Sequence, residues 1–127
     1  MSQNIVAVED EHASHPIATD WRPMLAEVVE RFVKGDFNLS NPVSGVLPVE
    51  TDVARHNKDY VTSYGQPLAS LSNEVWNSSC AQWMGTHWDI IIDLCTATDG
   101  ISDLVLTGKV VNINGKAMFT VGLIYVP

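Results

Sequence analysis

The sequence predicts an α+β protein, in which two helices accompany an antiparallel sheet and the first helix packs on one face of that sheet. Three observations predict this fold. Residues 88–126 contain three runs rich in β-branched and aromatic residues, separated by two short turns that contain glycine. Residues 20–34 and residues 51–64 each carry apolar side chains at helical spacing. Helices grouped ahead of a run of strands are typical of the α+β class.

The first predicted helix spans residues 20–34. Asp20 is a candidate N-cap, and Pro23 is tolerated in the first turn because its missing N–H is not needed there. Gly35 follows and predicts the end of the helix. The apolar stripe of this helix consists of Trp21, Leu25, Val28 and Phe32. We expect this stripe to pack on the apolar face of the sheet.

The second predicted helix spans residues 51–64, with Thr51 or Asp52 as its cap and Gly65 at its end. Its stripe consists of Val53, Asn57, Tyr60, Val61 and Tyr64. Because this stripe is more polar than that of the first helix, we expect the second helix to lie closer to solvent. Residues 36–48 are predicted to form a loop or a short edge strand, since proline and glycine interrupt them.

Edge strands are predicted between the second helix and the C-terminal meander. Residues 66–71 read as a short strand, and residues 79–84 read as another. Residues 72–79 are expected to form a turn or a short helical piece around Trp76. A turn at residues 85–86 leads into the meander.

The meander is predicted to consist of strands 88–97, 103–113 and 116–126, joined by turns at residues 99–100 and 114–115. Asn-Gly at the second turn is a strong hairpin signal, because a type I′ turn needs positive φ at both central residues. The predicted pairs across this hairpin are Ile113 with Lys116, Val110 with Phe119, Leu106 with Leu123, and Leu104 with Tyr125.

The first strand of the meander must keep its apolar residues on the same face, because a slip by one residue would turn them outward. The predicted pairs are Leu94 with Leu106 and Ile90 with Val110. The other face then carries Asp89, Ile91, Asp93 and Cys95 beside Lys109. Gly108 and Gly122 inside the strands indicate a bulge beneath a bulky core side chain, or else a close approach of another group.

The chain of 127 residues is long enough for one domain with a hydrophobic core. We assign residues 18–127 to this domain and residues 1–17 to a mobile, polar N-terminal arm. The arm lacks the basic start and apolar core of a signal peptide, and no apolar run approaches the roughly 20 residues of a membrane span. Cys80 and Cys95 are too few for a disulfide framework and fit free thiols in a reducing cytoplasm.

The chain is acidic, with a formal net charge of −8 and seven basic residues that form no cluster. This balance disfavours binding to nucleic-acid phosphates or to an anionic membrane surface. An acidic surface fits a basic protein partner, and it also fits plain solubility.

The densest group of polar and aromatic residues marks the candidate binding surface. The candidate partner-binding residues are Trp83, His87, Trp88, Asp89, Asp93, Asp99 and Asp103. Tryptophan anchors interfaces because it buries much area at little entropy cost, although a tryptophan in a strand is also a common core residue. His87 and Asp89 lie two apart on a strand and therefore face the same way.

Enzymatic and metal-binding signatures are weak in this sequence. The four histidines are scattered, and we expect no metal and no cofactor. The acidic residues at positions 99 and 103 resemble part of a calcium loop but lack its remaining ligands and closing glutamate. The sequence contains no P-loop, no C-x-x-C, no G-x-S-x-G and no G-x-G-x-x-G motif, so we expect no catalytic residues.

Several runs of the sequence resemble an uncharacterised family of small bacterial single-domain proteins of unknown function. These runs are Gln82-Trp83-Met84, His87-Trp88-Asp89-Ile90, Asp93-Leu94-Cys95-Thr96 and Gly100-Ile101-Ser102-Asp103-Leu104. The helix from Trp21-Arg22-Pro23 to Lys34-Gly35-Asp36 and the ending Tyr125-Val126-Pro127 are also similar. The resemblance implies a bacterial origin and a single α+β domain, and it transfers no catalytic residue. Cys95 stands where this family would have a tryptophan.

These observations lead to two hypotheses of function. The first is a non-enzymatic acidic binding protein, and more narrowly an immunity protein that neutralises a bacterial toxin of the contact-dependent inhibition type. The second is a small-molecule-binding protein or an enzyme with a pocket between the first helix and the sheet. Self-association through an exposed edge strand is a third, weaker alternative, and the oligomeric state is left open.

Overall fold

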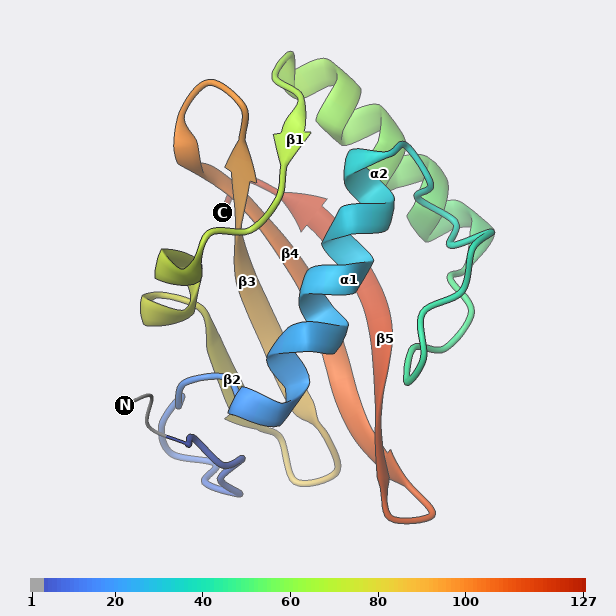
Figure 1. The fold of residues 1–127 in the computed structure, drawn as a ribbon. Coiled ribbons are helices and arrows are strands. Elements are labelled where there is room, and N and C mark those ends of the chain that lie inside the picture. Colours follow the sequence, from blue (N-terminus) through green and yellow to red (C-terminus); the bar gives the residue numbers. More distant parts are fainter. Residues whose placement is uncertain (1–3) are drawn as a thin grey trace.

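The computed structural model describes residues 4–127 and shows an antiparallel sheet with two α-helices among them (Figure 1). The helices are α1, Arg22–Val33, and α2, Thr51–Tyr64. The strands are β1 Leu68–Ala69, β2 Cys80–Trp83, β3 Trp88–Thr96, β4 Gly100–Ile113 and β5 Lys116–Tyr125. They form one sheet in the order β1-β3-β4-β5, and β2 pairs with β3 as well. The α+β class and the C-terminal meander are therefore confirmed.

The short elements between α2 and the meander also follow the prediction. Strands β1 and β2 both pair with β3, β1 near its C-terminal end and β2 near its N-terminal end. A 3-10 helix, Asn73–Asn77, separates them and contains Trp76. Strand β4 begins three residues earlier than predicted, so Asp103 lies within the strand.

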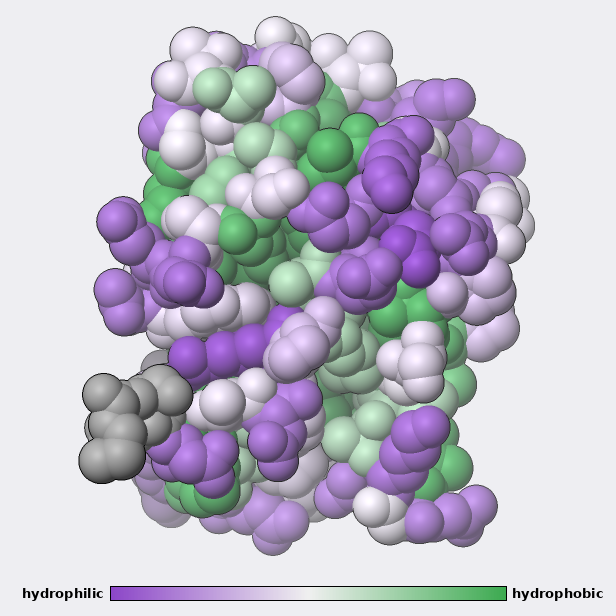
Figure 2. Space-filling model, in the orientation of Figure 1, coloured by the Kyte–Doolittle hydropathy of each residue, from purple (hydrophilic) through white to green (hydrophobic). Residues whose placement is uncertain are grey.

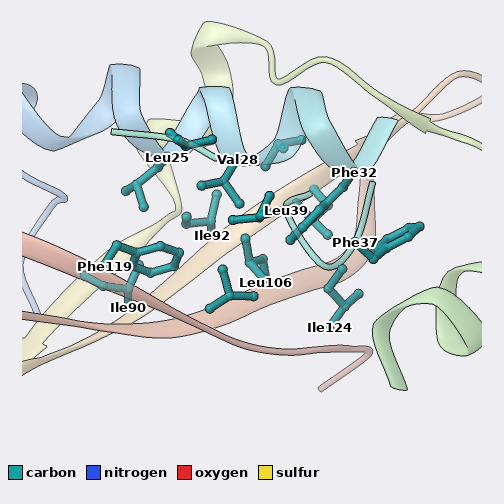
Figure 3. Packing of buried hydrophobic residues seen from close by; sticks show 14 of the residues in the cluster. Leu25, Val28, Phe32, Phe37, Leu39, Ile90, Ile92, Leu106, Phe119 and Ile124 are labelled. Carbon is teal, nitrogen blue, oxygen red and sulfur yellow. The ribbon is translucent and has the colours of Figure 1, made fainter. Parts of the chain in front are cut away.

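Helix α1 covers one face of the meander and closes the core (Figure 3). Leu25, Val28 and Phe32 point from α1 towards Ile92 and Leu106 of the sheet. These side chains are at most 2% exposed. The predicted packing of the first helix on the sheet is therefore confirmed.

The cap predicted for the first helix is wrong, because Asp20 lies in a 3-10 turn, Thr19–Trp21, that precedes α1. In the part of the chain that the structure describes, no side chain caps α1 or α2 by a hydrogen bond, so the predicted Thr51 or Asp52 cap is wrong as well. Pro23 occupies the first turn of α1, where its ring fits without loss of a hydrogen bond. The bounds of α2 agree with the prediction, and Gly65 ends it with a φ of 81°.

Helix α2 lies along the edge of β5 that does not pair with β4, and its side chains form hydrogen bonds with backbone groups at that edge. Asn57 Nδ2 donates to the carbonyl of Gly122 at 2.9 Å, and Asn57 Oδ1 accepts from the N–H of Ile124 at 2.7 Å. His56 Nε2 donates to the Ile124 carbonyl at 3.1 Å, and the Tyr60 hydroxyl accepts from the N–H of Val126 at 3.0 Å. The polar residues in the stripe of α2 therefore bind a strand edge.

The remaining part of that edge pairs with the loop between the helices. The N–H of Leu47 donates to the carbonyl of Phe119 at 2.9 Å, and the N–H of Phe119 donates to the carbonyl of Gly45 at 2.8 Å. This segment is otherwise a loop, so the predicted short edge strand is reduced to one isolated bridge, between Val46 and Phe119.

The described part of the predicted arm, residues 4–17, lies against the other edge of the sheet. His15 and Ala81 of β2 exchange two backbone hydrogen bonds, as neighbouring antiparallel strands do. The Val8 carbonyl accepts a hydrogen bond from Trp88 Nε1 at 3.0 Å. Ile17 at the end of the arm is fully buried. Residues 1–3 lie outside the described residues, and the mobility of the arm in solution stays a prediction.

The register of the meander agrees with the prediction near the hairpin and differs farther from it. Ile113 pairs with Lys116 and Val110 with Phe119, as predicted. Beyond a bulge, Leu106 pairs with Ile124 and not with Leu123. The extra residue is on β5, where Gly122 and Leu123 together lie opposite one residue of β4. The predicted Leu104–Tyr125 pair is wrong for the same reason, and Tyr125 pairs with Val105.

The pairing between β3 and β4 is shifted by two residues from the predicted one. Ile90 pairs with Gly108, and Ile92 pairs with Leu106. A shift by two preserves the side-chain alternation, so the predicted division between the two faces holds for Ile90 and for Asp89. A second irregularity lies between Asp93 and Cys95, and Cys95 is buried there.

Gly108 allows the ring of Phe119 to lie directly against the backbone of β4. A Cβ atom at Gly108 would come within 2.5 Å of two ring atoms of Phe119 and of the Thr120 carbonyl oxygen. Phe119 is fully buried in the core. The glycine therefore provides space for a bulky core side chain, which is the first of the two predicted reasons for a glycine in this strand.

Candidate functional site

The outer face of the sheet, opposite α1, carries two of the predicted partner-binding residues, Asp89 and Asp93. We define the outer face by eight side chains: Asp89, Ile91 and Asp93 of β3, Thr107 and Lys109 of β4, and Thr120, Leu123 and Tyr125 of β5. In the view of Figure 1, α1 lies in front of the meander, so the outer face points away from the viewer. Figure 2 shows the opposite, helix-bearing side, where hydrophilic residues surround smaller apolar areas.

A hollow of about 500 Å³ lies in the outer face across β3, β4 and β5. Its lining is mainly apolar, and Ile91 and Leu123 are 40% and 42% exposed in it. The backbone of Gly108 and Gly122 contributes to the lining, and seven of the eight outer-face side chains take part. Its size lies in the ordinary range of ligand-binding sites.

Asp89 is the carboxylate at the edge of this hollow. His87 Nε2 lies 3.0 Å from Asp89 Oδ1, and the Thr86 hydroxyl lies 2.9 Å from His87 Nδ1. Because a carboxylate accepts, Nε2 donates to Asp89 Oδ1, and Nδ1 lies within hydrogen-bond distance of the Thr86 hydroxyl. Lys109 lies directly across from Asp89 on β4. The arrangement fixes the orientation of Asp89 and leaves its side chain 46% exposed.

Asp93 lies on the same face of β3 and is fixed by the segment that precedes β2. The Ser78 hydroxyl donates to Asp93 Oδ2, and the backbone N–H of Asp93 donates to Ser79 Oγ at 3.1 Å. Asp93 is half-buried. The outer face therefore presents two oriented carboxylates on one strand.

Asp99 and Asp103 are exposed and lie near the turn between β3 and β4. The N–H of Asp99 donates to Thr96 Oγ1 at 3.2 Å, which is a local contact of the turn. Neither residue lines the hollow. The structure therefore separates these two aspartates from the Asp89 side of the outer face.

The tryptophans named by the sequence lie on the other face of the sheet. Trp88 is 5% exposed, and its ring centre lies 4.5 Å from that of Trp83 and 5.2 Å from that of Trp21. Trp88 is therefore a core residue whose indole N–H is bound by the arm, and it is not available to a partner. Alternation along β3 separates Trp88 from Asp89, so the predicted residues do not form one surface.

The candidate set omitted the apolar and aromatic residues of the outer face, which are Ile91, Leu123 and Tyr125. The alternation of the first meander strand already placed Ile91 beside Asp89. Leu123 could not be found in this way, because the bulge at Gly122 moves it from the predicted core face to the outer face.

The two cysteines do not form a reactive centre. Burial raises the pKa of the Cys80 thiol, and the nearby Asp93 carboxylate raises it further. Cys95 is buried, with Ser72 Oγ 3.9 Å from its sulfur. Among residues 4–127, no group of three or more His, Cys, Asp or Glu residues is placed to hold a metal ion.

The raised pKa predicts that Cys80 reacts slowly with thiol reagents, because the thiolate is the reactive form. At pH 8 we expect alkylation of Cys80 to be slower than that of free cysteine, and its rate should keep rising with pH beyond the point where free cysteine levels off. Time-resolved mass spectrometry with iodoacetamide measures both rates. A rate at pH 8 above that of free cysteine would contradict the structure, and unfolded protein provides the control.

The space between α1 and the sheet, where the sequence suggested a pocket, is filled by core side chains (Figure 3). Phe119, Leu39 and Phe37 add to the residues of α1 and β3 in this layer. The hollow of about 500 Å³ lies on the opposite, outer face of the sheet. The fold thus places its core on one side of the sheet and its candidate site on the other.

The fold and the outer face define a class of protein: a small α+β sheet protein that carries a helix on one face and a hollow on the other. The family model described as Domain of unknown function (DUF7668) matches residues 29–127. The chain belongs to this family of uncharacterised domains. The match begins inside α1 and includes every strand, so the outer face lies entirely within it.

The other comparisons give no relative from which a function could be transferred. No curated protein matches the chain. No solved structure matches it either. Within the described residues, neither helix is long and apolar enough to cross a membrane. A function must therefore be argued from the surface itself.

Proposed function

We propose that this chain is an acidic, non-enzymatic protein-binding domain that binds a basic protein partner at the outer face. One observation supports this most: exposed Ile91 and Leu123 lie on the same face of the sheet as the carboxylates of Asp89 and Asp93. More narrowly, we propose a bacterial cytoplasmic immunity protein that neutralises a toxin of the contact-dependent inhibition type.

The segments that cover parts of both sheet edges support the use of a face and not an edge. Helix α2 and the Gly45–Leu47 segment pair with β5, and His15 pairs with β2. A partner strand that adds to a sheet needs unpaired backbone groups at an edge, and these segments occupy such groups on both sides. The outer face keeps exposed apolar side chains for a partner to cover.

The net charge of −8 supports a basic partner. Complementary charge speeds diffusional encounter, and it would favour a toxin that itself binds nucleic-acid phosphates. An acidic protein docked over the basic site of such a nuclease would block access of the nucleic acid. The same charge disfavours nucleic acid and anionic membranes as direct partners of this chain.

A growth assay tests the proposal. The reading frame next to the gene is expressed alone and together with this protein. Growth arrest that is relieved only by co-expression would support an immunity role. Arrest that persists on co-expression, or a harmless neighbour, would contradict the immunity role for that pair.

Charge reversal tests the surface. We expect Asp89→Lys with Asp93→Lys to weaken partner binding at least about 30-fold, which is the scale of an interface hot spot. Asp52→Lys with Asp59→Lys on the exposed side of α2 makes the same change in net charge and is the matched control. Isothermal titration measures both affinities. Equal losses in the two variants would show a general charge effect and would remove the outer face from the proposal.

The hollow itself favours a second candidate, a small-molecule-binding protein or an enzyme. Thr107, Thr120 and Lys109 place polar groups in a mainly apolar lining, as ligand sites do. A ligand that binds only the folded state raises the melting temperature. A melting screen with metabolites and metal ions therefore tests this candidate, and a saturable upward shift that Ile91→Ser abolishes would support it over the protein partner.

A further inference from the structure

The hollow of about 500 Å³ in the outer face owes its position to the bulge on β5. The bulge on β5 places Gly122 in the lining, opposite Thr107 of β4. A Cβ atom at Gly122 would lie 2.9 Å from the Thr107 carbonyl oxygen and from Thr107 Oγ1. Because Gly122 has no side chain, the surface is recessed there between Ile91 and Leu123.

The walls of the hollow are mainly apolar, and they belong to strands of the sheet. The Thr107 hydroxyl donates to the Leu123 carbonyl at 2.8 Å, so this polar group is satisfied within the lining. Ile91 and Leu123 stand on β-strands of the central meander. A site on rigid strands binds without the entropy cost of ordering a loop.

The carboxylates near the hollow favour a positively charged group beside the side chain that enters the hollow. Asp89 lines the hollow, and Asp93 follows on the same face of β3. Lys109 lies across from Asp89, so Lys109 balances one carboxylate and the pair of aspartates keeps an excess of negative charge. His87 Nε2 forms a hydrogen bond with Asp89 Oδ1. This hydrogen bond orients the carboxylate and leaves its other oxygen for an incoming group.

We propose that this hollow receives one large apolar or aromatic side chain of a basic protein partner, and that Asp89 at the edge of the hollow binds a lysine or arginine next to that side chain. The inference rests on the proposed function and specifies its contact. It identifies Ile91 and Leu123 as the energetic centre of the interface, with Asp89 at its rim.

Two double variants with the same chemical change test the centre of the interface. Ile91→Ser with Leu123→Ser removes the walls of the hollow. Ile101→Ser with Ile113→Ser removes two isoleucines of similar exposure, 39% and 42%, that do not line it. We expect the first pair to weaken binding of the toxin identified in the growth assay at least about 30-fold, and the second pair to change it less than about 3-fold.

A variant that fills the hollow gives an independent result, because it adds apolar surface and does not remove it. Thr120 lines the hollow and is half-buried. We expect Thr120→Trp to weaken binding to a similar extent while circular dichroism shows a folded protein. If both Thr120→Trp and the Ile91/Leu123 variant bind like the wild type, the hollow is not the contact and the inference is overturned.

A small probe tests the same chemistry without any toxin. N-acetyl-Trp-Arg-amide presents an aromatic side chain beside a guanidinium group, and NMR titration detects binding in the millimolar range. We expect it to shift the NMR amide signals of Ile91, Gly122 and Leu123 saturably, and to leave that of Ile113 unchanged. A lack of shifts at about 5 mM overturns the inference.

The two proposals can fail separately. A wild-type protein that relieves toxicity while the hollow variants relieve it equally well would overturn the inference and leave the immunity role standing. A protein that binds the dipeptide in the hollow but relieves no neighbouring toxin would remove the immunity role and keep the assigned chemistry of the hollow.

Discussion

Replacement of Asn57 by leucine is expected to lower the free energy of unfolding by about 4 kcal/mol and the melting temperature by roughly 12 °C. Asn57 is fully buried and pairs with two backbone groups of β5, the Gly122 carbonyl and the Ile124 N–H. Leucine has a similar volume but pairs with neither, and each unpaired buried group costs about 2 kcal/mol. Urea unfolding followed by circular dichroism measures the change.

Two further variants separate the hydrogen bonds from packing. Asp59→Leu makes an apolar change on the exposed side of the same helix, and we expect it to change stability by less than about 0.5 kcal/mol. Asn57→Asp keeps the shape and the acceptor but loses the donor to Gly122. Burial beside a carbonyl raises the pKa of the new carboxyl in the folded state, so its protonated form restores the donor.

The expected pH dependence of the stability of Asn57→Asp follows from the raised pKa of its buried carboxyl. A group with a raised pKa in the folded state contributes stability that is present at low pH and lost as the pH rises through this pKa. The deficit of Asn57→Asp relative to the wild type should therefore shrink on acidification. A deficit that is constant with pH, or a leucine variant as stable as the wild type, would contradict the assigned role of Asn57.

Replacement of Gly108 by alanine is expected to cost about 3 kcal/mol, the upper range for overpacking of a core. The added methyl group would meet the Phe119 ring and the Thr120 carbonyl oxygen at 2.5 Å, and a backbone oxygen in a sheet cannot move aside easily. Thermal unfolding should show a fall in melting temperature of roughly 10 °C.

A double-mutant cycle identifies the clash. Phe119→Leu alone should destabilise the protein by leaving a cavity, but combined with Gly108→Ala it should cost less than the sum of the two changes. Lys109 is an exposed neighbour on β4, so Lys109→Ala is the control. It measures the cost of placing alanine, which has a low strand propensity, in this strand without a clash. Additive effects of the two core changes would show that the ring does not need the space at Gly108.

The elements of this fold were predictable because local signals agreed with tertiary packing. Asn114-Gly115 fixed the hairpin, and the structure has positive φ at both residues. Alternation placed Asp89 and Ile91 on one face of β3 without knowledge of the helix that covers the other face. Gly65 marked the end of α2 by its left-handed conformation.

The features that escaped prediction depend on residues far apart in the chain. Asn57 stood out as a polar residue in a helical stripe, but its partners on β5 lie more than 60 positions later. The bulge at Gly122 was indicated as an alternative, yet its position could not be fixed, and one extra residue moved Leu123 to the outer face. The candidate site was therefore predicted in part: its carboxylates were named and Ile91 was placed beside them, but the position of Leu123 on this face was not predicted.

The covered edge of β5 affects how readily the chain aggregates during its synthesis. Strand β5 leaves the ribosome after the segments that pair with its edge, Gly45–Leu47 and α2, because both precede it in the chain. The strand can therefore be sealed as soon as it pairs with β4, so the growing protein has little time to recruit another chain. A nascent chain that stops before residue 116 lacks this seal and leaves β4 as an open template for amyloid-like stacking. Protection against aggregation is thus set by the order in which the sequence is read.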